Sequence, residues 1–385
     1  MSRRARRTKK AIWFLLFLWI GIRVFPLTVW GTPLGEVPEG VSDWESRLPE
    51  EIASLLPEGM ASENTEELGK AAMEMTSPQW LLSVVGELVE VGWKDALRLF
   101  ASLVGLLLIA SVFGALRRSF SSGGVAEAVR FCSCLGIFAL ILQWQGERLL
   151  EVAEYLDRLS TLVGAMIPVT GAVWAMGGNV ATASAGTAGL SVFITICQRL
   201  CAETVIPVCG FCTAAALCQV LSPELGLRSL AGAIKKVYTV SLGLIMTVLV
   251  ASLGAQTALG TAADSAAART AKSLSATVIP VVGGSVGDTL RTVAAGVQYL
   301  KTVLGISGIA MILLLTLPTL LSLLLARLVL LLGSGVAELL GCEEEGRLLS
   351  ELGTVYGCMI AVVTMCALMF LIGLWIFVRT VVATA

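Results

Sequence analysis

Charged side chains inside long apolar stretches are the residues of this chain that could do chemistry. Arg199 and Glu203 are four residues apart, and Asp288 and Arg291 are three apart, so each pair could form an ion pair on one helix face. Glu338 lies in a short apolar stretch just before three consecutive glutamates. Charges at membrane depth are costly, so such residues mark candidate ion or substrate pathways. The alternative is that they are interfacial charges whose side chains reach water.

The composition excludes the common catalytic chemistries. The chain has no histidine, so it lacks Ser-His-Asp and Cys-His nucleophiles and imidazole metal ligands. Its ten cysteines include the close pairs Cys197 with Cys201 and Cys209 with Cys212. These pairs lie in apolar stretches where cysteine acts as a small hydrophobe, which makes a redox or zinc role the weaker alternative. We therefore expect no enzyme activity, no cofactor and no metal.

Helix-breaking repeats are the most specific pattern in the sequence. Ile-Pro-Val-x-Gly occurs three times, beginning at residues 167, 206 and 279. Proline removes a helix donor and glycine permits close packing, so each copy is expected to kink or break a helix. Such breaks favour a substrate site or pore, although three ordinary kinks remain the alternative. The residues concerned are Pro168, Gly171, Pro207, Gly210, Pro280, Gly283 and Gly284.

The elements that position these residues are predicted to be membrane helices. Hydrophobic residues make up 56% of the chain and charged residues only 14%, against about 25% charged in soluble domains. We expect an all-α polytopic membrane protein with roughly seven to nine spans, several of them broken by Pro or Gly. A membrane span needs roughly 20 apolar residues, so the short stretches are ambiguous. The stretches are residues 97–116, 131–143, 161–176, 189–198, 204–221, 237–253, 302–326, 328–340 and 354–378.

Charge segregation divides the 385 residues into three regions. Residues 1–31 carry seven basic and no acidic side chains. Most of the basic residues precede an apolar run within this region, as in a signal peptide or an uncleaved signal anchor. Residues 32–95 carry three basic and fourteen acidic side chains. We expect this proline-interrupted segment, with short amphipathic helices, to be exported, either as a binding segment or as a solvated spacer. Residues 96–385 form the predicted membrane domain.

Basic residues between the apolar stretches predict the orientation of the membrane domain. Because cytoplasmic loops are enriched in Lys and Arg, residues 32–95 should be extracytoplasmic and the C-terminus cytoplasmic. On this interpretation Arg228, Lys235, Arg327 and Arg379 mark cytoplasmic ends. The net charge of −1 offers little attraction to nucleic acid, and the chain lacks a G-x-x-x-x-G-K-[ST] motif. Any ATP-driven step would therefore need a partner.

The sequence Ala-Thr-Val-Ile-Pro-Val-Val-Gly-Gly at residues 276–284, followed by Asp288, resembles the stage III sporulation protein AE family. The resemblance covers essentially the whole chain. It implies a multi-pass component, in the mother-cell membrane around the forespore, of a channel or secretion-like complex required for late forespore development. It also implies other stage III sporulation membrane proteins as partners, including a separate secretion-type ATPase, and a homo-oligomer is compatible with it. The alternative is a secondary transporter with a substrate site at the broken helices.

Overall fold

The computed structural model describes residues 40–380 except for residues 58, 61, 63, 120–122, 222–226 and 279–282. Residues 1–31 and Pro280 therefore lie outside the described residues. Within them the chain is helical and contains no strand, which confirms the all-α prediction. The elements are α2 (Ser42–Ser46), α3 (Glu50–Ala53), α4 (Thr65–Met75), α5 (Pro78–Ser119), α6 (Gly123–Met176), α7 (Val180–Cys197), the π-helix η1 (Gln198–Ala202), α8 (Glu203–Leu221), α9 (Leu227–Val278), α10 (Gly283–Leu339) and α11 (Glu343–Arg379).

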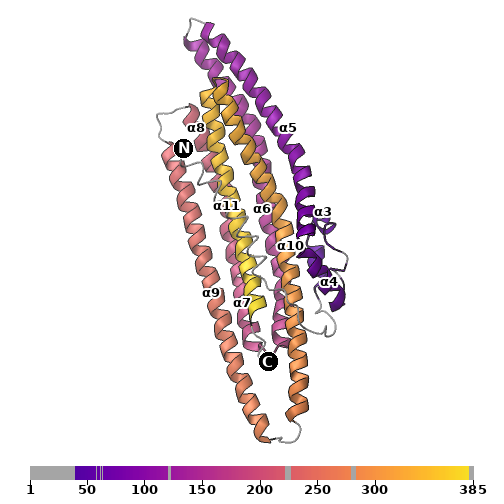
Figure 1. The fold of residues 1–385 in the computed structure, drawn as a ribbon. Coiled ribbons are helices and arrows are strands. Elements are labelled where there is room, and N and C mark those ends of the chain that lie inside the picture. The colour runs from indigo at the N-terminus through magenta and orange to yellow at the C-terminus, as the bar shows by residue number, and fades with distance from the viewer. Residues whose placement is uncertain are drawn as a thin grey trace, which may run out of the picture.

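The long helices form an antiparallel bundle (Figure 1). We call each helical run along the bundle a leg; α7, η1 and α8 together form one leg. Six helical segments among the described residues are long and apolar enough to cross a membrane. They are longer than a bilayer requires: the 57 residues of α10 extend roughly 85 Å at about 1.5 Å per residue, against a hydrocarbon core of about 30 Å. The bundle therefore continues beyond the depth of a bilayer.

The described residues contain six candidate spans rather than the seven to nine that were expected. The difference has one cause: stretches separated in the sequence by charges or glycines are joined in continuous helices. Residues 131–143 and 161–176 both belong to α6, and residues 302–326 and 328–340 both belong to α10. Likewise, 189–198 and 204–221 are linked through η1. A single charge, such as Arg327, does not end a helix whose backbone hydrogen bonds are intact.

The number of legs bears on the predicted orientation. Helix α5 begins beside α3 and α4 part-way along the bundle, and α11 ends farther toward the tip formed by α9 and α10 (Figure 1). Arg228, at the start of α9, lies at the opposite end from Arg379. If every leg crosses the membrane once, Arg228 and Arg379 lie on opposite sides, and residues 32–95 share a side with the C-terminus. The orientation expected from the sequence, with a cytoplasmic C-terminus, stays a prediction.

Two glycines in the left-handed conformation end helices and allow tight reversals. Gly178 (φ 76°) follows α6 and Gly341 (φ 73°) follows α10. At the first turn the N–H of Asn179 donates to the carbonyl of Trp174 at 3.0 Å, and at the second the N–H of Cys342 donates to the carbonyl of Ala337 at 2.9 Å. These bonds satisfy carbonyls that a helix end leaves free. They allow α6 to reverse into α7 and α10 into α11 within a few residues.

The acidic N-terminal segment packs on the bundle. Trp44 of α2 is 1% exposed, and its Nε1–H donates to the carbonyl of Ala165 in α6 at 3.3 Å. Leu68 and Met75 of α4 also belong to the main hydrophobic core. From Pro78 onward the segment is the first part of α5, which runs without interruption through residue 95. The acidic segment and the membrane domain therefore share one core and one helix.

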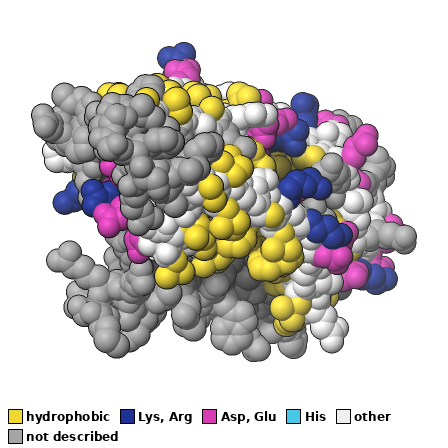
Figure 2. All heavy atoms as spheres, turned by 90° about the horizontal axis from the view of Figure 1, so that it is seen from above, with side chains coloured by type: hydrophobic (Ala, Val, Ile, Leu, Met, Phe, Trp, Pro, Cys, Tyr) yellow, Lys and Arg dark blue, Asp and Glu magenta, His cyan; other side chains and the backbone are white. Residues whose placement is uncertain are grey.

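One face of α9 presents an apolar stripe to the outside. Val237, Val240, Leu244 and Val248 are 61–66% exposed and follow a helical spacing of three to four residues. Viewed along the bundle axis, hydrophobic side chains likewise form a patch on the surface between groups of charged side chains (Figure 2). Exposed apolar surface of this extent is unfavourable in water. It fits contact with lipid, in agreement with a membrane protein.

A carboxylate on α9 caps the N-terminus of α7 and so joins the two helices. Asp264 of α9 is 6% exposed and accepts hydrogen bonds from the N–H groups of Ala181 and Thr182 at 2.8 Å and from the Thr182 hydroxyl at 2.7 Å. These first-turn amides have no partner within α7, and a carboxylate suits the positive end of the helix dipole. A Cβ on Gly260, one turn away on α9, would lie 2.8 Å from the Cα of Thr182. The cap thus depends on close helix approach.

A buried lysine holds the end of α11. Lys301 of α10 is fully buried and donates to the carbonyl of Thr380 and, at 2.8 Å, to its hydroxyl. Its ammonium lies 5.7 Å from the ring centroid of Phe377. The Nε1–H of Trp174 in α6 donates to the same Thr380 hydroxyl at 2.8 Å. Because an unpaired buried ammonium is costly, these acceptors at the negative end of α11 compensate its loss of water.

We expect Gly260→Ala to destabilise the protein by about 1–3 kcal/mol, because overpacking against the α7 backbone forces the helices apart. Gly232→Ala on the same helix is the matched control, since Gly232 is exposed and a Cβ there meets nothing within 4 Å. The control should be neutral or stabilising by about 0.5–1 kcal/mol. Unfolding in detergent, followed by tryptophan fluorescence, measures both. Equal stability of the two variants would contradict a tight α7–α9 contact.

Candidate functional site

An ion pair with a further polar partner lies between α6 and α10. Arg148 and Glu151 of α6 form an ion pair at 2.5 Å, with their side chains 24% and 32% exposed. The other carboxylate oxygen of Glu151 accepts a hydrogen bond from the hydroxyl of Ser322 in α10 at 2.8 Å. The spacing of three residues on α6 places Arg148 and Glu151 on one helix face. Glu151 therefore links two helices through its two oxygens.

A cavity of about 390 Å³ adjoins this ion pair. It lies between α5, α6 and α10, and its walls carry both apolar side chains and charges. Pro318 of α10 also lines it; a proline inside a helix leaves the carbonyl four residues earlier without its usual donor. The polar lining residues are Glu87, Asp95, Arg148, Glu151 and Ser322. The space is large enough for several water molecules.

Two further arrangements of charged side chains involve α9, α10 and α11. Lys235 of α9 and Glu351 of α11 form an ion pair at 3.7 Å, with side chains 14% and 17% exposed. The guanidinium of Arg327 lies against α11, where a Cβ on Gly357 would be 3.2 Å from it. Arg327 follows Ser322 by five residues, about 7.5 Å along α10. We call Arg148, Glu151, Ser322, Arg327, Lys235 and Glu351 the polar layer.

The polar layer offers charge and hydrogen bonding inside an otherwise apolar bundle. Its members come from α6, α9, α10 and α11, and α5 completes the wall of the cavity. Ionisable side chains at membrane depth are characteristic of ion and substrate pathways. Carboxylates and guanidinium groups can bind or conduct a polar solute.

The predicted helix breaks lie elsewhere. Helix α6 is continuous through Pro168, and α8 contains Pro207 just after the π-helix η1. Both prolines and Gly210 are exposed on the bundle surface, so the first two repeats do not line the cavity. A Cβ on Gly171 would lie 2.6 Å from Thr187 Cγ2, which makes this residue a contact between α6 and α7.

The third repeat lies at the boundary between two helices. Helix α9 ends at Val278 and α10 begins at Gly283, with Gly284 in its first turn. Pro280 lies outside the described residues. The ends of α9 and α10 project beyond the other helices at one end of the bundle (Figure 1). Gly283 and Gly284 of the third repeat are therefore far from the polar layer along the bundle axis.

The predicted intramembrane charges are not members of the polar layer. Arg199 and Glu203 are exposed, and among the described residues no ion pair joins them, although the helix continues between them as η1. Glu338 is exposed near the end of α10. Asp288 and Arg291 lie in the first turns of α10, and their side-chain positions are outside the described part. For Arg199, Glu203 and Glu338 the surface position agrees with the interfacial alternative.

The sequence interpretation missed Asp264, Lys301 and Pro318. Asp264 is an isolated acid within the small-residue tract of α9, and Lys301 immediately precedes the apolar stretch 302–326. Pro318 lies inside that stretch, where a proline signals a locally weakened helix. The sequence shows these signals. It does not show their partners, because Asp264 acts on α7 and Lys301 on the end of α11, each about 80 residues away.

Comparison with known proteins gives one consistent family. The family model described as stage III sporulation protein AE matches residues 63–381. The stage III sporulation protein AE of Bacillus subtilis (strain 168) is 21% identical over 263 residues, which cover 68% of this chain and 65% of that protein. The matched part therefore spans slightly less than two thirds of the relative's length. No solved structure matches the chain.

We expect Glu151→Ala to destabilise the protein by about 1–3 kcal/mol, because it leaves a half-buried guanidinium without its carboxylate and removes the hydrogen bond that joins α6 to Ser322. Glu154→Ala on the same helix is the control. Glu154 pairs with Arg158 at 2.5 Å, but those side chains are 61% and 43% exposed. Exposed pairs contribute about 0–1 kcal/mol. Denaturant unfolding in detergent compares the two, and a smaller effect at Glu151 than at Glu154 would refute a structural role for the polar layer.

Proposed function

The chain belongs to the stage III sporulation protein AE family, and from this premise we propose that it acts without enzyme activity as a component of a channel or secretion-like complex. As a sporulation membrane protein it would sit in the mother-cell membrane around the forespore and support late forespore development. The observation that carries the proposal is the cavity lined by Arg148, Glu151 and Ser322 of the polar layer, between helices of membrane-spanning length. A polar opening of this kind suits a conduit or its gate.

Two features support a role within an assembly. The chain has no P-loop motif, so energy for transport would come from a separate secretion-type ATPase among the other stage III sporulation membrane proteins. The α9–α10 and α5–α6 helix pairs project at opposite ends of the bundle and offer surfaces to partners or to further copies of the chain (Figure 1). In this proposal residues 32–95 are extracytoplasmic, and the C-terminus would share that side if each of the six legs crosses the membrane once.

Deletion of the gene in its endospore-forming host should block sporulation after engulfment, because late forespore development would lose the proposed conduit. The measurement is the count of heat-resistant spores together with microscopy of engulfed forespores. A strain complemented with the wild-type gene is the control. Normal spore counts in the deletion strain would contradict the proposal. Accumulation of a solute against a gradient by the purified protein in liposomes would instead identify a secondary transporter.

A second prediction separates the polar layer from the rest of the bundle. In the complemented deletion strain, Glu151→Gln should reduce heat-resistant spores well below wild type, because it removes a charge from the cavity while preserving side-chain shape. Glu154→Gln, at an exposed position on the same helix, should support normal counts. Immunoblots of membrane fractions must show equal amounts of both variants. Equal sporulation of the two strains would show that the cavity charge is not used.

A further inference from the structure

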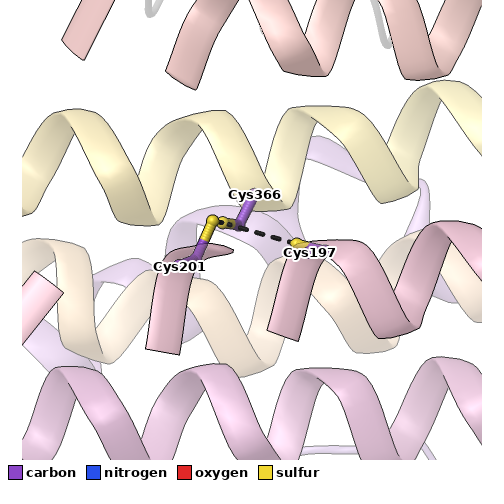
Figure 3. A group of neighbouring side chains, drawn as sticks. All are labelled: Cys197, Cys201 and Cys366. Carbon is purple, nitrogen blue, oxygen red and sulfur yellow. Dashed lines mark hydrogen bonds between the residues drawn. The ribbon is translucent and has the colours of Figure 1, made fainter. Parts of the chain in front are cut away.

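Three cysteines from two parts of the chain meet in the bundle core. Cys197 ends α7, Cys201 lies in η1 and Cys366 lies in α11 (Figure 3). The Sγ of Cys366 is 3.8 Å from that of Cys197 and 3.1 Å from that of Cys201. All three sulfur atoms lie within 4.8 Å of one another, and the residues are at most 4% exposed. A facing cluster of three thiols is a different arrangement from isolated buried cysteines.

The spacing of the sulfur atoms fits one metal ion. Zinc–thiolate bonds are about 2.3 Å long, so three sulfurs around one ion lie roughly 3.8–4.0 Å apart in tetrahedral or trigonal geometry. The separation between Cys366 and Cys197 (3.8 Å) lies at the lower edge of that range, and the separation between Cys366 and Cys201 (3.1 Å) lies below it. Small side-chain rotations would therefore bring all three sulfurs to bonding distance. Thiolate ligands select thiophilic ions such as zinc and monovalent copper.

The backbone at the cluster is unusual. Cys201 lies within the π-helix Gln198–Ala202, which interrupts the α-helical course from α7 to α8. Short π-helical turns are rare and are frequent at functional sites. Here the turn carries Cys201, and Cys197 directly precedes it. This places both thiols on the side that faces Cys366 of α11 (Figure 3). The π-helical turn therefore helps to position two of the three thiols.

The surroundings combine a dry core with a nearby polar surface. Phe193 and Phe370 pack edge to face at 5.6 Å, from the same two helices that carry Cys197 and Cys366. On the outer side of the turn, Arg199 is exposed, and the amide of Gln198 donates to Asp157 at 3.3 Å. The buried Cys201 and the exposed Arg199 thus belong to the same π-helical turn, so the thiols lie close to a polar surface but inside a core that excludes bulk water.

We propose that Cys197, Cys201 and Cys366 bind a single thiophilic d¹⁰ cation, either Zn²⁺ or Cu⁺. Binding replaces the three thiol protons, which pass to solvent, by three metal–sulfur bonds. The bound site carries a net charge of −1 with Zn²⁺ and −2 with Cu⁺, and no electron transfer is involved. The metal would join the α7–α8 leg to α11. That connection fixes the turn at η1 relative to the helix that supplies Glu351 to the polar layer.

The primary test measures metal content of the full-length protein purified in detergent with a reductant that contains no thiol. Mass spectrometry of metals should find about one equivalent of zinc or copper per chain, and separate loading of the apoprotein with Zn²⁺ or Cu⁺ distinguishes the two ions. Cys366→Ser should reduce the content to background. Cys358→Ser is the matched control, because Cys358 is a buried thiol of the same helix facing Cys209. It should retain the metal.

X-ray absorption of the loaded wild-type protein gives a readout that does not depend on folding of a variant. It should show about three sulfur scatterers near 2.3 Å from the metal. A metal surrounded by oxygen or nitrogen alone would overturn the proposal, as would retention of the metal in Cys366→Ser. Failure of the wild-type protein to bind either ion would also overturn it. So would a disulfide between Cys201 and Cys366 in the freshly isolated protein, detected by non-reducing mass spectrometry.

Discussion

The need to satisfy backbone hydrogen bonds within the chain controls this structure. In hydrocarbon an unpaired N–H or C=O group costs several kcal/mol, so a helix is favoured wherever its bonds can continue. Arg327 interrupts the hydropathy of α10 without interrupting its bonds, and the charged stretch in the middle of α6 is equally helical. Chain reversals occur where a glycine adopts positive φ, as at Gly178 and Gly341. Backbone satisfaction, more than local hydropathy, therefore decides where the legs begin and end.

Because the helices are continuous, contacts between side chains determine how the helices are aligned with one another. Close packing of apolar helix faces already favours particular alignments, and a buried hydrogen-bonded charge narrows them further because its partner lies at one position. Glu151 meets Ser322 only in one alignment of α6 with α10, and Asp264 meets the first turn of α7 only in one alignment of α9. Lys301 sets the end of α11 in the same way. These contacts occur at different levels of the bundle and together define how its legs are stacked.

Composition and charge were sufficient to predict helices and a membrane location, because these follow from local hydropathy. The family was predicted from a short motif. The number of legs was not predictable in the same way, since hydropathy records where charges fall and not whether the helix continues through them. The first two repeats show a related limit: Pro168 and Pro207 have the residue type of a broken helix, but they lie inside α6 and α8 and are exposed at the surface. The cavity instead depends on Glu151, Ser322 and Pro318, which are brought together by tertiary packing.

The same constraint limits how a conduit in this bundle could open. Unwinding a helix beside the cavity would expose backbone groups to lipid, and the legs that line it are continuous through the polar layer. Tilting or shearing of whole legs preserves those backbone bonds and changes only side-chain contacts. Glu151 with Ser322 and Lys235 with Glu351 lie between different helices, so such motion must break or exchange them. The polar layer therefore links the opening of the cavity to the relative positions of the legs.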